Sequence, residues 1–356
     1  MQSSPLAHPI PAKETTAKME NLIPGWCERI PKVEIHLHLE GAIPLPTMWQ
    51  LLQKYGGDPE IPNIAALTSK FVFKDFAQFI DTWIWKNQFI REYEDFTLLS
   101  EAVARDLARQ NIRYVEAFCS PGDFERHNLT PQGIITAIRQ GLDRVPGIRI
   151  ALIADLIRDT GSDPNKASNT LHAVNEVRDQ GVIGIGLGGS EQKYPAGLFK
   201  KVFAEARNLF FHTTAHAGEA AGAESVWAAL ESLHVERIGH GIRAIEDPML
   251  VRTLADLHIP LEICPISNVC TGVVSSIEKH PIRSLYNRGV IVTVNTDDPK
   301  MFDTSLALEY ATLYNKLGFT QTEIKGVILQ TIRSTWLDDD EKDVMLAEFQ
   351  KDPNWK

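Results

Sequence analysis

The chain has few cysteines, and none is placed as a metal site or a disulfide framework would require. Cys27, Cys119, Cys264 and Cys270 are the only cysteines in 356 residues, and no two of them form a C-x-x-C pair. A disulfide-stapled secreted domain and a cysteine zinc site are therefore not suggested. We expect a reducing, cytoplasmic setting.

Positive charge and long apolar runs are also scarce. The chain has 36 Lys and Arg against 46 Asp and Glu, which gives a formal net charge of −10, and no basic cluster carries interleaved aromatics. A polyanion would be repelled, so nucleic acid is not an expected partner. No apolar run approaches the roughly 20 residues of a membrane span, and the N-terminus lacks the basic and apolar regions of a secretory leader, so no membrane association is expected.

What is present is ordinary for a globular protein, with 44% hydrophobic and 23% charged residues. A chain of 356 residues can form one large α/β domain with a substantial core. We expect a loosely ordered N-terminal segment over residues 1–22 and a single domain over residues 23–350.

Short β-branched segments recur along the chain. There are eight, at residues 33–40, 112–121, 148–157, 182–189, 210–219, 237–242, 260–268 and 290–299. Amphipathic stretches such as "TPQGIITAIRQGLDRV" separate most of them, with apolar residues at the three- and four-residue spacing of a surface helix. Eight strands alternating with helices predict a (β/α)8 TIM barrel, with an open doubly wound sheet as the alternative.

The gap between the first two predicted strands is too long for one crossover helix. It contains "FVFKDFAQFIDTWIWKNQFI", which we interpret as an inserted helical lid over one end of the barrel. Phe73 and Phe76 are candidates for contacting a substrate from this lid. Aromatic side chains on a helix more often belong to the core, and that alternative stays open.

The stretch "VEIHLHLEGAIP" places His36 and His38 two positions apart in an apolar run. In a strand, such residues point to the same face, so the two imidazoles would project side by side into the barrel. The pair indicates two metal ligands. Two hydrogen-bonded core histidines are the alternative.

More polar residues fall where later predicted strands end. They are His216 and Glu219 in "TAHAGE", His240 in "RIGHGI", and Asp297 and Asp298 in "VNTDDP". Barrel enzymes build their sites at these strand ends. Imidazoles with a carboxylate favour zinc, with one position open for a water of lowered pKa. With Glu219, His240 and Asp298 included, there are more polar residues than one metal needs as ligands, which indicates acid–base roles for these three. Glu219 taken alone could be a solvated loop residue.

The chain resembles the adenosine deaminase branch of the amidohydrolase superfamily. The resemblance runs from Pro31 to about Asp340 and rests on "KVEIHLHLEGAIP", "HAGE", "IGHGI", "CPISN" and "VNTDDP", in the family's order and spacing. The H-x-E and P-C-x-x-C motifs of the zinc deaminases that act on nucleic-acid bases are absent.

This resemblance implies one divalent metal per chain, zinc or another, and a set of ligands: His36, His38, His216 and Asp297. It further implies three roles in deamination: Glu219 as proton donor to purine N1, His240 as the group that holds and deprotonates the attacking water, and Asp298 as a hydrogen-bond partner of N7. Glu219 must then keep its proton near neutral pH, which requires a dry pocket that raises its pKa.

The resemblance also bears on the substrate, which it implies is a small molecule containing adenine. Gly189 matches the glycine whose backbone amide contacts N3, and Asn268 is expected to support the site from outside the ligand set. Glu40 stands where adenosine deaminases commonly have Asp, and Ser190 in "GGSE" replaces an acid. These departures look more like the branches that act on adenine or on modified adenine nucleosides, including the aminodeoxyfutalosine deaminases. Glu40 could also reach the same sugar hydroxyl with a longer arm.

We therefore expect a hydrolase that removes the 6-amino group of an adenosine-type or modified adenine nucleoside and releases ammonia. Free adenine is the alternative substrate. Amide or ester hydrolysis at the same metal ranks lower, and "VIGIGLGGS" has no lysine to bridge a second metal. A barrel that only binds its ligand would be expected to lose a metal ligand, and none is lost. The sequence favours no oligomeric state.

Overall fold

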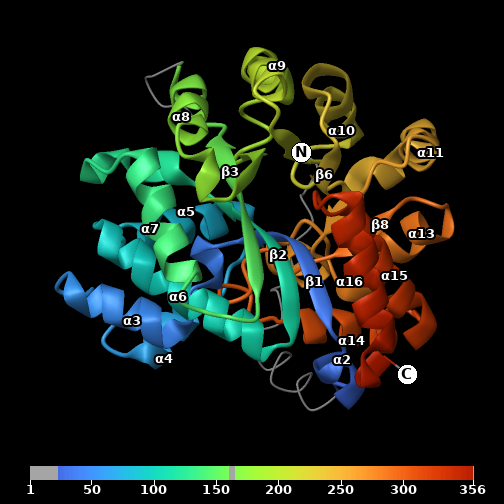
Figure 1. Cartoon of the computed structure of the whole chain (residues 1–356), viewed down its shortest axis with the longest axis horizontal. Coiled ribbons are helices and arrows are strands. Elements are labelled where there is room, and N and C mark those ends of the chain that lie inside the picture. Colours follow the sequence, from blue (N-terminus) through green and yellow to red (C-terminus); the bar gives the residue numbers. More distant parts are fainter. Residues whose placement is uncertain (1–22, 160–164, 356) are drawn as a thin grey trace, which may run out of the picture.

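The computed structural model describes residues 23–159 and 165–355, so the expected loosely ordered segment lies outside it. The chain forms a (β/α)8 TIM barrel, as predicted, with eight parallel strands in sequential order inside a ring of helices (Figure 1). The strands are β1 (Lys32–His38), β2 (Ile112–Cys119), β3 (Arg149–Ile157), β4 (Val182–Gly188), β5 (His212–Ala217), β6 (Arg237–His240), β7 (Leu261–Ile263) and β8 (Val292–Val294).

The barrel closes where β8 meets β1. Leu37 forms an isolated parallel bridge with Asp297, and the backbone N–H of His38 donates to the Asp297 carbonyl at 2.8 Å. Beneath this bridge, the Glu34 carboxylate accepts from the backbone N–H of Thr296 at 2.6 Å. Two chain segments that carry predicted metal ligands are therefore joined directly.

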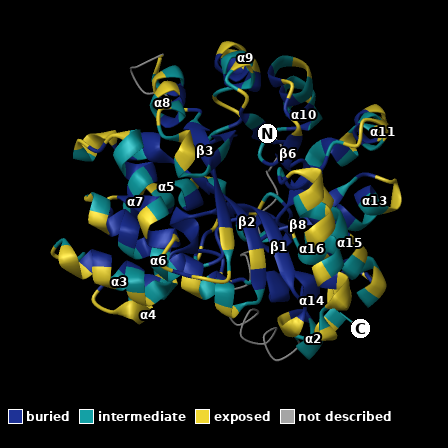
Figure 2. Cartoon of the chain, in the orientation of Figure 1, coloured by how far each residue is buried: buried dark blue, intermediate teal, exposed yellow. Residues whose placement is uncertain are grey.

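All eight predicted strands exist, but most are shorter than predicted, the last two most of all. The predicted strand 260–268 is β7 followed by a helix that begins at Pro265, because proline at the first helical position is already set to a helical φ. The strands are buried on both faces, as a parallel sheet covered by helices requires. Figure 2 shows this burial, with exposed positions concentrated on the outer helices.

The helices follow local sequence signals. Thr130 caps the helix after β2 by accepting from the Gly133 N–H, and Pro131 occupies its first turn. The helices are α2 (Gly25–Arg29), α3 (Leu45–Lys54), α4 (Ile64–Lys70), α5 (Phe76–Asn87), α6 (Tyr93–Arg109), α7 (Pro131–Leu142), α8 (Lys166–Asn175), α9 (Lys200–Asn208), α10 (Ala223–Ala228), α11 (Pro248–Asp256), α12 (Pro265–Cys270), α13 (Ile282–Asn287), α14 (Leu306–Lys316), α15 (Gln321–Ser334) and α16 (Asp339–Lys351).

Short 3-10 or π turns complete the loops at η1 (Glu40–Ala42), η2 (Pro121–His127), η3 (Arg178–Gln180), η4 (Ala196–Phe199), η5 (Ala229–Leu233), η6 (Ile242–Glu246), η7 (Ile277–Lys279) and η8 (Pro353–Trp355). None of the helices in the described ranges is both long and apolar enough to span a membrane.

The segment inserted between β1 and β2 packs against the end of β1. Within it, α5 begins after Asp75, whose side chain accepts from the Gln78 N–H at 2.9 Å. Lys86 on α5 donates to the Glu40 carbonyl at 2.8 Å, and Trp83 lies edge-on to His38 with ring centroids 5.8 Å apart. Helix α5 therefore lies beside the residues predicted to form the site.

Candidate metal centre and active site

The four predicted metal ligands come together inside the barrel. His36 and His38 project from β1, His216 from β5, and Asp297 follows β8, and all four side chains are buried. The Nε2 atoms of His38 and His216 are 3.1 Å apart. Asp297 Oδ1 lies 3.4 Å from His36 Nε2 and 3.3 Å from His38 Nε2.

These separations fit one divalent metal. Four ligand atoms held tetrahedrally at zinc distances lie about 3.3 Å from one another. In addition, His36 Nε2 is buried without a hydrogen-bond partner among the described residues, as a nitrogen reserved for a metal would be. Imidazoles with one carboxylate form a donor set typical of zinc.

The backbone is strained at two predicted functional residues. His240 has φ of 58° and Asp297 has φ of 63°, a left-handed conformation that residues other than glycine rarely adopt. Nearby, a Cβ atom at Gly41 would lie 1.7 Å from Asp298 Oδ1. Glycine at position 41 is therefore what leaves room for the Asp298 carboxyl.

A second cluster of possible ligand atoms includes Cys264 together with His36, His240 and Asp297. Burial raises the pKa of the Cys264 thiol well above its usual value, and the sulfur faces the Glu262 carbonyl at 3.7 Å. A protonated thiol is a poor ligand, so the first cluster is the better metal site. Cys264 is fully buried, as a cysteine that packs in the core would be.

A buried network of ion pairs contacts the Nδ1 side of the His36 ring. His36 Nδ1 lies 2.8 Å from Glu262 Oε2, and Glu262 Oε1 lies 2.6 Å from Arg237 Nε. Arg237 Nη1 donates to Glu116 Oε2 at 2.5 Å, and its guanidinium stacks 3.5 Å above the Trp336 ring. Burial opposes ionisation of Glu262, but Arg237 and His36 outweigh it and hold its pKa below the usual value. This network was not expected from the sequence, in which charged residues inside apolar strand segments are its only sign.

Glu219 faces the cluster of predicted metal ligands and is almost excluded from solvent. It is 5% exposed, and its Oε2 lies 3.7 Å from His240 Nε2. Burial, reinforced by the charges of Asp297 and Glu191, raises the Glu219 pKa well above its usual value. A carboxyl group in this position keeps its proton and can donate it, as the predicted role requires.

Glu191 holds the loop that carries Glu219, another role that the sequence analysis missed. Its Oε1 accepts from the Gly218 N–H at 2.7 Å. Its Oε2 accepts from the backbone N–H groups of Glu219, Ala220 and Ala221 at 3.1, 2.7 and 3.0 Å. In the sequence, the only sign of this role is that Glu191 is the last residue of the "GGSE" stretch.

A chain of hydrogen bonds sets the orientation of His240. The Ile282 N–H donates to His280 Nδ1 at 3.2 Å, and burial lowers the His280 pKa to about 3, so its ring is neutral with the proton on Nε2. That proton is donated to Asn268 Oδ1 at 3.2 Å, which leaves the Asn268 amide to donate to His240 Nδ1 at 3.0 Å. Neutral His240 therefore carries its proton on Nε2, facing the cluster. Asn268 contacts the site in the supporting position expected of it.

The predicted substrate residues lie at different points of the fold. Glu40 is 1% exposed and lies in η1 beyond the end of β1, where its Oε1 accepts from the Ser120 N–H at 2.9 Å. Gly189 follows β4 with φ of 99°, a left-handed conformation open to glycine. Asp298 is buried, and its Oδ1 has no hydrogen-bond partner among the described residues.

The two lid phenylalanines belong to an aromatic cluster. Phe73 precedes α5 instead of lying in it, since the helix starts only after the Asp75 cap, and its ring packs 5.5 Å from Phe79 and 5.9 Å from Phe302. Phe76 lies 5.9 Å from Phe79. Phe73 belongs to the hydrophobic core and Phe76 is half-buried against it, so contact of either ring with a substrate stays a prediction, whereas Trp83 on α5 contacts a predicted ligand.

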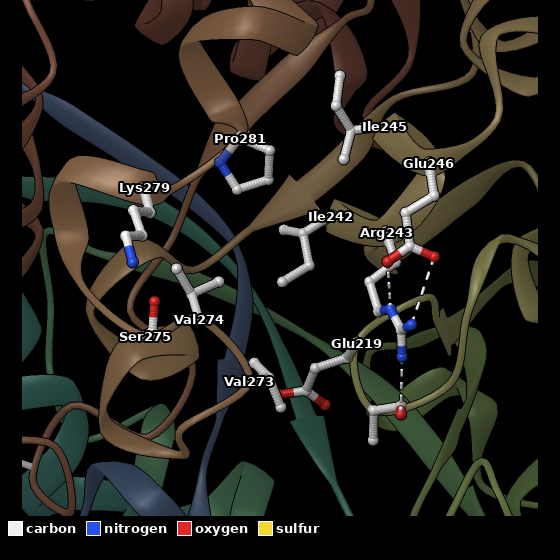
Figure 3. Close-up of a pocket in the computed structure, with 11 residues that line it drawn as sticks. Glu219, Ile242, Arg243, Ile245, Glu246, Val273, Val274, Ser275, Lys279 and Pro281 are labelled. Atoms are coloured by element: carbon white, nitrogen blue, oxygen red, sulfur yellow. Dashed lines mark hydrogen bonds and ion pairs between the residues drawn. The ribbon is translucent and has the colours of Figure 1, made fainter. Parts of the chain in front are cut away.

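A cavity of about 430 Å³ opens beside Glu219 (Figure 3). Its lining includes the apolar side chains of Ile242, Val273 and Val274, together with Arg243 and Glu246, which form an ion pair at 2.8 Å. Glu219 is therefore reached from outside through a partly apolar space.

Comparison with known proteins places this geometry in one family. The family model described as "Adenosine deaminase" matches residues 31–352. Aminodeoxyfutalosine deaminase of Streptomyces avermitilis is 34% identical over 323 residues, covering 90% of this chain and 90% of the relative. Adenine deaminase of Ectopseudomonas mendocina is 34% identical over 303 residues, covering 84% of this chain and 95% of the relative.

A solved structure shares the fold closely. The crystal structure of an amidohydrolase from Burkhoderia ambifaria with bound zinc superposes with a TM-score of 0.83 at 28% identity. The match covers 91% of each chain.

Proposed function

Because the chain belongs to the adenosine deaminase family, we propose that it removes the 6-amino group of an adenine-containing small molecule by zinc-dependent hydrolysis and releases ammonia. The observation that carries this proposal is the meeting of His36, His38, His216 and Asp297 at metal-ligand separations, with a buried Glu219 facing them. A cytoplasmic location is proposed with it, on the absence of a disulfide framework.

The proposed metal site uses the four ligands named above, and the proposed metal is zinc. The donor set and the zinc-bound relative support that choice. A divalent metal held by these ligands would lower the pKa of a water molecule and so supply a nucleophile near neutral pH.

The remaining residues do the acid–base work in this proposal. Glu219 donates its proton to purine N1, which breaks the ring aromaticity and makes C6 electrophilic. His240, with Nε2 facing the cluster, holds the attacking water, and Asp298 hydrogen-bonds N7. This orientation of His240 favours holding the water over removing its proton. The amino group then gains the proton that the C6 hydroxyl loses, so that ammonia leaves from the tetrahedral carbon as the C6 carbonyl forms.

The proposed substrate is an adenosine-type or modified adenine nucleoside, with Glu40 and the Gly189 amide contacting the purine or its substituent. Relatives named aminodeoxyfutalosine deaminase and adenine deaminase support this range, and free adenine is the second candidate. We place the inserted helix α5 as the lid, since Trp83 and Lys86 contact His38 and Glu40. Another hydrolysis at the same metal ranks lower.

A spectrophotometric screen tests the proposal. Zinc-loaded protein is incubated with adenine, adenosine, deoxyadenosine and 5′-substituted adenosines, and the change in purine absorbance is matched to released ammonia. We expect conversion of at least one compound, and none after metal removal by a chelator. If fully zinc-loaded protein releases ammonia from none of these compounds, the proposal is wrong.

A further inference from the structure

Ser267 lies in the "CPISN" stretch, and the mechanism above gives it no role. It is fully buried in α12, and its Oγ lies 2.6 Å from Asp297 Oδ2. A carboxylate that binds a metal is deprotonated and can only accept a hydrogen bond, so the Ser267 hydroxyl is the donor. The contact has the short distance expected when a hydroxyl donates to an ionised carboxylate.

The two oxygens of Asp297 have different surroundings. Oδ1 lies among the predicted ligands, 3.4 Å from His36 Nε2 and 3.3 Å from His38 Nε2. Oδ2 is turned towards Ser267, while His240 Nε2 is 3.9 Å from it and therefore beyond hydrogen-bond distance. One oxygen is thus directed at the metal site and the other is held by a side chain.

The backbone of Asp297 is fixed, so only its side chain can still turn. The Asp297 N–H donates to the His36 carbonyl at 3.2 Å, and the Asp297 carbonyl accepts from the His38 N–H at 2.8 Å. These two bonds hold Asp297 beside β1 but do not decide which carboxylate oxygens reach a metal. The hydrogen bond from Ser267 is the contact that distinguishes them.

Helix α12 presents the Ser267 hydroxyl from a fixed position. The helix begins directly after β7, which pairs with β8, so its first turn lies beside the residues that follow β8. The Ile266 N–H donates to Glu309 Oε2 at 3.2 Å, and Thr271 Oγ1 donates to the Ser267 carbonyl at 2.9 Å. Both ends of this short helix are therefore anchored.

The number of Asp297 oxygens on the metal matters for hydrolysis. Both oxygens of a carboxylate can bind one metal ion, and the second would take a coordination position. A catalytic zinc site needs one position open for water. We propose that Ser267 is a positioning residue, whose hydroxyl engages Oδ2 of Asp297 so that the carboxylate binds the metal through Oδ1 alone. This inference rests on the metal site proposed above.

Azide titration of the cobalt-loaded protein tests this inference without a substrate. An anion that enters the open position shifts the visible absorption bands of Co²⁺, and wild type should show that shift. In Ser267→Ala the freed Oδ2 should occupy the position, so azide should bind about tenfold or more weakly. Turnover of the substrate found in the screen should fall by about 10- to 100-fold, with one metal per chain retained.

Crystal structures of the zinc-loaded proteins provide the direct readout. They should show one Asp297 oxygen on the metal in wild type and both in Ser267→Ala. Ser267→Thr keeps the hydroxyl and should bind azide as wild type does. Should Ser267→Ala fail to fold, Ser267→Cys replaces it, because a thiol is a weaker donor.

Thr271→Val is the matched control for disturbance of the helix. It removes a buried hydroxyl that donates to the Ser267 carbonyl and not to Asp297. Urea unfolding of the metal-free proteins should show lower stability for Thr271→Val and Ser267→Ala alike. Only Ser267→Ala should lose azide binding.

The inference is overturned if both Asp297 oxygens bind the metal in wild type, or if Ser267→Ala binds azide as tightly as wild type. An equal loss of azide binding in Thr271→Val would also overturn it, since disturbance of α12 would then explain the result. Each of these outcomes leaves the deaminase proposal standing. A wild type that binds neither cobalt nor zinc would count against the metal site and this inference together.

Discussion

His36 on β1 and Glu262 on β7 meet at 2.8 Å, between Nδ1 and Oε2, although they stand 226 positions apart in the chain. A histidine that binds a metal through Nε2 is held in place by what its Nδ1–H contacts, and a carboxylate also makes the ring a better donor. Arg237 compensates the buried carboxylate, so the network extends from the metal cluster to the base of the barrel.

Glu262→Gln is predicted to weaken zinc binding by about 10- to 100-fold, the usual effect of losing a group that orients a metal ligand. Zinc affinity is measured by competition with a chromophoric chelator, and stability by urea unfolding of the metal-free protein. Glu116→Gln is the matched control, because Glu116 pairs with Arg237 on the side away from His36. It should lower the free energy of unfolding while zinc affinity stays near wild type. Equal zinc affinity in wild type and Glu262→Gln would refute the orienting role.

His36→Ala is predicted to lose metal and activity together. Wild type should contain about one divalent metal per chain, because three imidazoles and one carboxylate form one open site. Elemental analysis of the zinc-loaded proteins measures this. His212→Ala removes a half-buried histidine at the opposite end of β5, where it pairs with Glu236, and should keep its metal. Substoichiometric metal in wild type after careful zinc loading would remove the basis of the mechanism.

The meeting of the candidate ligands could be predicted in part from the geometry of strands, while their assignment as ligands came from the family resemblance and stays a prediction. His36 and His38 share a face through the period-two alternation, and the other candidates fall where predicted strands end. The barrel itself was predicted from alternating β-branched and amphipathic segments. Both predictions depend on local patterns, each of which is contained in a short segment of the sequence.

Partners that depend on register between distant strands could not be predicted in this way. Nothing in "PLEICP" says that Glu262 contacts His36, since that contact follows from the order and register of separate strands. Phe73 was misplaced because the helix begins only at Phe76, directly after the capping residue Asp75.

Glu219→Gln is predicted to lower turnover by about 10²- to 10⁴-fold with metal content intact, because glutamine keeps the size of the side chain but cannot transfer a proton. The same role predicts the direction in which the activity of wild type changes with pH. The proposed donor must be protonated, so kcat/KM is full below the Glu219 pKa and falls as pH rises through it. Since that pKa is raised, the fall should occur well above the range of an ordinary glutamate.

The pH profile is measured between mildly acidic and mildly alkaline buffers at saturating zinc. Glu224→Gln, an exposed neighbour whose carboxylate accepts from the Gly222 N–H, is the control and should keep both turnover and profile. Retention of most activity by Glu219→Gln would show that the proton comes from another group.

Asn268→Asp is predicted to reduce turnover by about tenfold or more while metal is retained. The carboxylate would accept a hydrogen bond from His240 Nδ1 where the amide now donates one, and the proton of the imidazole would move to Nδ1. Turnover and the ¹⁵N shifts of His240 measure the two halves of this prediction. A changed tautomer with unchanged turnover would mean that the Nε2 proton has no part in the reaction.

Glu40→Ala is predicted to weaken catalysis by about 1–3 kcal/mol, the cost of a lost hydrogen bond to a buried polar group, with metal binding largely unaffected. The Glu40 side chain has a structural role and a proposed substrate-binding role, since Oε1 accepts from the Ser120 N–H while Oε2 is free for substrate. Glu40→Gln is therefore the matched control, because its amide oxygen can still accept from Ser120 but only one acceptor remains.

If Glu40 selects substrate, its loss in kcat/KM should differ between adenine and its nucleosides, and Glu40→Gln should show most of that difference. Measuring kcat/KM for each substrate in wild type and both variants separates the duties. A structural role would instead appear as a loss common to all substrates in Glu40→Ala and largely restored in Glu40→Gln. Both substitutions keep the hydrogen bond from Lys86 on α5 to the Glu40 backbone carbonyl. A uniform loss would thus place Glu40 in the barrel rim and leave substrate selection to other residues.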